Sequence, residues 1–131
     1  MESDTASPLP ETRLRKFRQA AFVYLHVGIL YEFAAFAMWR EGILPVDRGP
    51  VVLWLVLGAA ITLLVSWALW HWPRPWLARA VWAVHGLRIP ALVSGAFFHD
   101  PALAAPASFY LTALVVVVGN MWMLARAGWD L

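Results

Sequence analysis

The sequence predicts an all-α membrane protein in which four transmembrane helices pack as a small bundle. The first observation is composition: 62% of the 131 residues are hydrophobic and 14% are charged, whereas about 25% of a soluble domain is charged. The second is segmentation, because mostly apolar stretches recur at about the 20-residue length that crosses a bilayer. These spans cover residues 17–39, 51–70, 76–98 and 108–125.

The connections between the spans carry the residues that end helices. Residues 1–12, MESDTASPLPET, are polar and are expected to form a disordered cytoplasmic tail, followed by a single transmembrane domain over residues 13–131. The linkers REGILPVDRGP, HWPRPW and HDPALAAP contain prolines, and two of them contain further turn formers. Valines in LTALVVVVG favour strands. Because only a closed barrel satisfies strands in lipid, this stretch is predicted to be helical.

The basic residues predict the orientation of the bundle. Cytoplasmic loops carry an excess of lysine and arginine, and one side of the predicted bundle holds most of them: Arg13, Arg15, Lys16, Arg18, Arg74, Arg79 and Arg126. The other side has Arg40 and Arg48, which are matched by Glu41 and Asp47. Both termini are therefore expected to be cytoplasmic. The preference for arginine over lysine suggests a GC-rich bacterial genome, so the expected location is a bacterial inner membrane.

Composition also narrows the classes of site and partner. The chain has no cysteine, which excludes disulfides, zinc–thiolate sites and iron–sulfur clusters. The net charge of +2 is too small to indicate nucleic acid, and the expected partner is the lipid bilayer. No G-x-S-x-G motif or P-loop is present. We therefore expect neither catalytic residues nor a metal site.

The segment AVHGLRIPAL, residues 83–92, places a charge inside an apolar span. Arg88 is expected to lie about 18 Å from the inner end of the third span. A central charge costs about 2.5–3.5 kcal/mol on insertion scales, and arginine cannot escape by losing its proton. The only acid inside a predicted span is Glu32, about 22 Å into the first. A buried Glu32–Arg88 pair is the simplest prediction.

Helical phase predicts which faces meet inside the bundle. At about 100° per residue, His85 shares a face of the third span with Arg88, and Tyr31 shares a face of the first with Glu32. The second and fourth spans each have a small, weakly polar face. The expected polar core comprises Tyr31, Thr62, Ser66, His85 and Asn120. Pro90 is expected to kink the third span, because its ring clashes with the carbonyl of Gly86.

These features favour a non-catalytic accessory or structural subunit of a larger membrane assembly, in which the Glu32–Arg88 pair fixes two spans in register. The alternative is a proton-coupled small-solute transporter that acts as an oligomer, with Glu32 as the proton site biased by Arg88. Ala91 and Gly95 form a small-xxx-small pair that would suit a homodimer.

The layout of the predicted bundle bears on the transporter alternative. Four spans, Glu32 in the first, and Trp82 with a kink in the third resemble the layout of the small multidrug resistance exporters. The resemblance is confined to layout and implies export of small solutes. Arg88 departs from it, because a fixed positive charge beside the acid would repel cationic substrates.

A second alternative is a redox subunit that binds haem b or a quinone. Haem held between helices needs two histidines at matching depth, and His26 and His85 are both expected about 13 Å from the inner side. However, His26 lies about 160° around the helix from Gly28, so it does not easily share the interior face. The main expectation is therefore a chain without a cofactor.

Overall fold

The computed structural model describes residues 8–43, 50–98 and 105–131 and is helical throughout its ordered elements. Within these residues, four helical segments are long and apolar enough to cross a membrane, which confirms the predicted all-α architecture and is typical of a multi-pass membrane protein. The third of these segments consists of two shorter helices. The elements are α1 (Glu11–Arg40), α2 (Val51–His71), α3 (Pro75–Gly86), α4 (Ile89–Phe97) and α5 (Ala107–Trp129).

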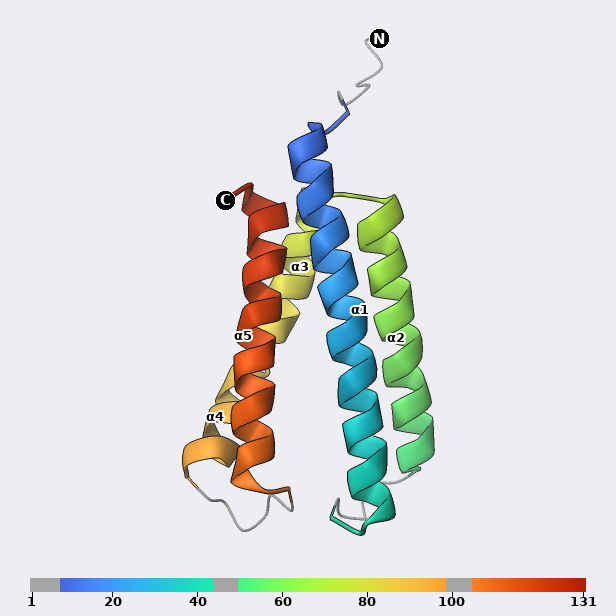
Figure 1. Ribbon diagram of the computed structural model, residues 1–131, viewed down its shortest axis with the longest axis vertical. Coiled ribbons are helices and arrows are strands. Elements are labelled where there is room, and N and C mark those ends of the chain that lie inside the picture. Colours follow the sequence, from blue (N-terminus) through green and yellow to red (C-terminus); the bar gives the residue numbers. More distant parts are fainter. Residues whose placement is uncertain (1–7, 44–49, 99–104) are drawn as a thin grey trace.

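The helices are arranged around α1 and α5. α1 packs against α2 on one side and α5 on the other, and α5 also packs against α3 and α4 (Figure 1). The start of α1, the end of α2, the start of α3 and the end of α5 all lie at one end of the bundle, which we call the terminal end (Figure 1). Successive spans therefore run in opposite directions.

α1 is longer than the predicted first span. It begins at Glu11, directly after Pro10, whose fixed backbone suits the residue before a helix. The last two residues assigned to the tail are thus the first two of α1, and residues 1–7 of that tail lie outside the described part of the chain. The basic stretch at residues 13–18 is consequently helical, so its side chains project in different directions around α1.

The third span breaks where Pro90 predicts a kink. Pro90 has no N–H to donate to the carbonyl of Gly86, and α3 ends at Gly86. The next turn is tighter, since the Arg88 N–H donates to the His85 carbonyl at 3.0 Å. Helical geometry resumes at Ile89 in α4, for which Arg88 is the N-cap residue. The break changes the direction in which Arg88 projects relative to His85.

The apolar core sits at the terminal end, where four helices converge. Its largest members are Phe17, Leu69 and Leu124, each fully buried. Small residues fill the spaces between them and let the backbones approach closely. The cluster as a whole comprises Phe17, Ala20, Ala21, Leu69, Ala78, Val81, Leu124 and Ala127. This packed end holds the remaining lengths of the helices in register.

Two glycines set the close approach of α1 and α2. Gly28 of α1 lies against Thr62 of α2, so that a Cβ at residue 28 would collide with the threonine side chain. One turn further along the antiparallel pair, Gly58 of α2 lies against the Glu32 carboxyl group of α1. Each helix therefore presents one glycine and one larger polar side chain to the other.

Three cations fasten the last turn of α5 to its neighbours. Arg13 donates from Nε to the Ala127 carbonyl at 3.2 Å and from Nη2 to the Gly128 carbonyl at 3.0 Å. Arg79 of α3 donates to the same Gly128 carbonyl at 2.9 Å. Lys16 forms an ion pair with Asp130 at 2.9 Å. Positive groups at a helix C-terminus satisfy its free carbonyls and favour its dipole.

Candidate functional site in the bundle interior

A buried hydrogen-bonded pair joins α3 to α5 beyond the apolar core. Asn120 of α5, 1% exposed, contacts Nε2 of His85, 7% exposed, at 3.3 Å. The other ring nitrogen, Nδ1, lies 3.0 Å from the Val81 carbonyl, which only accepts. The arrangement is satisfied by a neutral His85 that donates from Nδ1 and accepts from Asn120 at Nε2. The Tyr24 ring of α1 packs edge-on against His85, with centroids 5.3 Å apart.

Glu32 faces α2 and not α3. Its Oε1 lies against Gly58, in a space that a Cβ at residue 58 would fill. Its Oε2 is buried and has no hydrogen-bond partner in the structure. A buried carboxylate oxygen without a donor carries a desolvation cost that no contact offsets.

Arg88 lies on a different side of α1. Its guanidinium stands over the ring of Tyr31, with Cζ 5.1 Å from the ring centroid, and its side chain is exposed. Tyr31 itself packs against Phe109 of α5, with ring centroids 6.2 Å apart. Arg88 therefore contacts an aromatic ring of α1 and remains exposed on the outside of the chain.

The predicted Glu32–Arg88 ion pair is not formed in this geometry. Within the described residues, no carboxylate oxygen lies within the 4.0 Å of the Arg88 guanidinium that an ion pair requires. The reason is helical phase: Tyr31 and Glu32 are consecutive, so their side chains diverge by about 100°. Tyr31 faces α4 and α5, whereas Glu32 faces α2.

The expected polar core is largely buried but is divided between two interfaces. Thr62 and Ser66 of α2 are 7% and 6% exposed and lie on its side toward α1. His85 and Asn120 bury their side chains between α3 and α5. Tyr31 is 37% exposed. Among the described residues, the structure therefore buries four of these five side chains and does not join them into one hydrogen-bonded network.

The two histidines considered as haem ligands do not face each other. His26 is exposed, and its Nδ1 bonds to the Phe22 carbonyl of its own helix at 2.8 Å. Two residues earlier, Tyr24 faces His85, which places His26 about 160° away from that contact. Both nitrogens of His85 already have partners. His71 is exposed at the end of α2, and His99 lies outside the described residues.

Sequence reasoning missed two features that shape this interior. Gly58 was not assigned a role, although a lone glycine one turn before Thr62 in an apolar span is a signal for close helix approach. Gly95 lies against the ring of Tyr110, so α4 approaches α5 at that point. Gly95 is thus used within the chain, which leaves less of the proposed Ala91–Gly95 surface free for a second copy.

The sequence matches no known family model, no curated protein and no solved structure. Inference about function has to start from the side chains of this chain.

Proposed function

We propose that the protein is a non-catalytic subunit of a larger membrane assembly, and that the face of α4 that carries Arg88 meets its partner. The partner is expected to place a carboxylate beside the guanidinium. A second copy of the chain is one such partner. A carboxylate from the partner would neutralise Arg88, which Glu32 of the same chain does not contact.

The exposure of Arg88 is the observation that supports this proposal. A cation over an aromatic ring gains about 0.5–2 kcal/mol, whereas a charged residue at the centre of a span costs about 2.5–3.5 kcal/mol or more. The Tyr31 contact therefore offsets only part of the cost of placing Arg88 in the span. Arginine stays protonated in proteins, so the remainder has to come from water, a lipid headgroup or a partner's carboxylate.

The experiment is purification of a tagged full-length chain from its native membranes in a mild detergent. The wild-type chain is expected to elute with a stoichiometric partner, well above its own mass of 14.7 kDa. Arg88→Gln is expected to reduce the recovered partner at least tenfold, which corresponds to about 1.4 kcal/mol. Arg40→Gln, at the far end of α1, is the control and should keep the partner. A monomeric wild-type chain would contradict the proposal, as would a complex that Arg88→Gln leaves intact.

The unpartnered Oε2 atom of Glu32 supports a second function, proton-coupled movement of a small solute by an oligomer. A carboxyl group in that position is suited to take up and release a proton as its surroundings change. Hydrophobic carbodiimides modify protonated carboxyl groups within membranes. Labelling is expected at Glu32, to decrease as pH rises, and to disappear in Glu32→Gln but not in Glu41→Gln. A chain that resists labelling at every pH would exclude a proton site at Glu32.

A further inference from the structure

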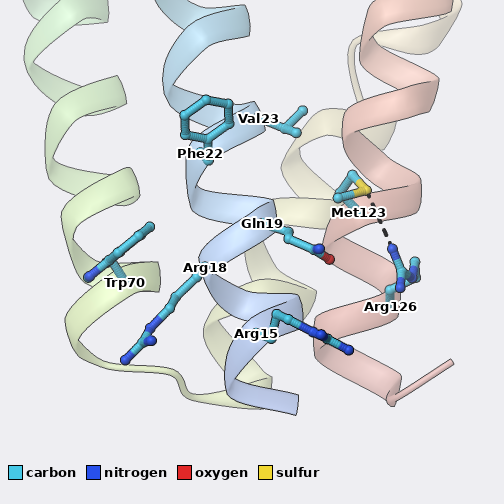
Figure 2. Close-up of a pocket in the computed structure, with 8 residues that line it drawn as sticks. All are labelled: Arg15, Arg18, Gln19, Phe22, Val23, Trp70, Met123 and Arg126. Atoms are coloured by element: carbon cyan, nitrogen blue, oxygen red, sulfur yellow. Dashed lines mark hydrogen bonds between the residues drawn. The ribbon is translucent and has the colours of Figure 1, made fainter. Parts of the chain in front are cut away.

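A basic groove opens on the surface of the terminal end, where it crosses α1 between α2 and α5. It has a volume of about 390 Å³ and is lined by α1, α2 and α5 (Figure 2). Three arginines and a glutamine supply its polar lining, and aromatic and aliphatic side chains supply the rest. The lining residues are Arg15, Arg18, Gln19, Phe22, Val23, Trp70, Met123 and Arg126.

The arginines of this groove are not the ones that fasten the helices together. Arg13, Lys16 and Arg79 bind backbone carbonyls or Asp130 at the end of α5. By contrast, the Arg18 guanidinium lies over the Trp70 ring, 5.6 Å from its centroid, and Arg126 donates to the Met123 sulfur at 3.9 Å. Within the described ranges, no carboxylate lies within 4.0 Å of any of the three groove arginines. Their positive charge is therefore available to an anion.

The position of the groove distinguishes an anionic lipid from a soluble anion. The arginines lie in the first turns of α1 and the last turns of α5, where apolar helices emerge into the headgroup layer. Phe22 and Val23 continue the groove one turn deeper along α1, toward the hydrocarbon (Figure 2). A ligand with a phosphate at one end and an acyl chain at the other would meet both parts.

We propose that this groove binds an anionic phospholipid, with its arginines attracting the headgroup phosphate and an acyl chain along Phe22. Basic pockets between transmembrane helices are known to hold such headgroups. Trp70 provides an amphipathic ring at the same level, which is typical of the membrane interface.

Native mass spectrometry of the purified full-length chain tests the proposal. The protein is mixed with equal amounts of phosphatidylglycerol and phosphatidylcholine that carry identical acyl chains. The wild-type chain is expected to retain one phosphatidylglycerol in preference to phosphatidylcholine. Each of Arg15→Gln, Arg18→Gln and Arg126→Gln is expected to weaken that retention about fivefold, because a basic residue near an anionic headgroup contributes about 1 kcal/mol. The triple variant should lose the preference.

Arg74→Gln is the matched control. It removes the same charge from an exposed side chain at the same end of the bundle, outside the groove. If it weakens retention as much as Arg18→Gln does, only the general positive charge attracts lipid and the proposed site is wrong. Equal retention of the two lipids by the wild-type chain would also overturn it. Arg15 and Arg18 are exposed, so the single variants should fold and the comparison remains valid.

A competition measurement separates a lipid from a free phosphate. Inorganic phosphate at millimolar concentration is added to the chain with bound phosphatidylglycerol. The lipid is expected to stay bound, because the apolar part of the groove holds its acyl chain. Displacement by inorganic phosphate would show that the groove recognises a soluble anion and would overturn the lipid assignment.

Discussion

At the scale of single residues, the α3–α5 contact depends on the hydrogen bonds of His85. His85 receives a donor from α5 and donates within α3, so both of its ring nitrogens are used. In lipid, an interhelical hydrogen bond of this kind contributes about 0.6 kcal/mol on average and up to about 1.7. Removing one partner lowers the free energy of unfolding by more than the hydrogen bond contributes, because the remaining polar group stays buried without a partner.

A double-mutant cycle at this pair tests the bond. We expect Asn120→Leu and His85→Phe to lower the free energy of unfolding by about 1–3 kcal/mol each. The double variant should be more stable than the sum of the two losses predicts, because neither polar group is left unpaired. Chemical unfolding in mixed micelles measures the four stabilities. His26→Phe, at an exposed histidine, is the control. Strict additivity would mean that the bond contributes nothing.

The Lys16–Asp130 ion pair provides a pH-dependent contact at the membrane surface. The hydrogen bond from Lys16 lowers the pKa of Asp130 below its ordinary value of 3.8. The contact therefore contributes to stability at pH values above 3.8 and is lost as pH falls through the lowered pKa of the folded chain. An NMR titration of the Asp130 carboxyl group should show this lowered midpoint, and Lys16→Gln should move the midpoint upward. The same midpoint in both proteins would contradict the contact.

At the scale of elements, the close packing of α1 against α2 depends on two glycines, Gly28 and Gly58, which have no side chain. A methyl group at residue 28 would overlap Thr62, and one at residue 58 would overlap the Glu32 carboxyl group. Neither neighbour can withdraw without moving a helix or turning a polar group toward lipid. The interface is therefore sensitive to the addition of a single carbon atom, whereas a Cβ at Gly119 would meet no atom within 4 Å.

Alanine substitutions measure that sensitivity. Gly28→Ala and Gly58→Ala are each expected to lower the free energy of unfolding by about 1–3 kcal/mol, as overpacking does. Gly119→Ala is the matched control, because a Cβ there meets no atom within 4 Å. It should be neutral or raise stability by up to about 1 kcal/mol through better helix propensity. Combining Gly28→Ala with Thr62→Ala should recover part of the loss. Equal effects at all three glycines would show that propensity, and not contact, determines the outcome.

At the scale of the whole molecule, the terminal end holds two groups of cations with different partners. The first group is Arg13, Lys16 and Arg79, and the second is the three arginines of the groove. One group binds the end of α5, and the other lines the groove between α2 and α5. Both groups fall on the side of the bundle that the excess of arginine marks as cytoplasmic. The predicted orientation rests on the charge of both groups, whereas the proposed lipid site belongs to the second group alone.

Reporter fusions test the orientation. Because the start of α1 and the end of α5 lie at the same end of the bundle (Figure 1), fusions at the two termini are expected to give the same signal, and the arginine excess predicts that it is cytoplasmic. A reporter inserted at Asp47, which lies outside the described residues, is expected to be external. A terminus that reports from the external side would contradict the predicted orientation.

The sequence alone determined the number of spans, their approximate bounds and the break at Pro90. These properties depend on local quantities: the length of an apolar stretch, the absence of an N–H on proline and the hydrocarbon thickness. The sequence also identified most of the polar residues that are buried, since a polar side chain within a span is an anomaly wherever its helix packs. The start of α1 was less well defined, because a basic stretch can be helical without being apolar.

Only the tertiary structure decided which of these polar residues meet. Glu32 and Arg88 have comparable predicted depths, but depth does not specify which neighbour each side of α1 faces. α2 occupies the side of α1 that carries Glu32 and offers the space at Gly58, whereas the turn before Pro90 directs Arg88 to Tyr31. The basic stretch at residues 13–18 is divided for the same reason: some of its side chains contact the end of α5, and others line the groove. Residues that are adjacent in sequence diverge by about 100° on a helix, so their partners depend on the order of the helices around α1.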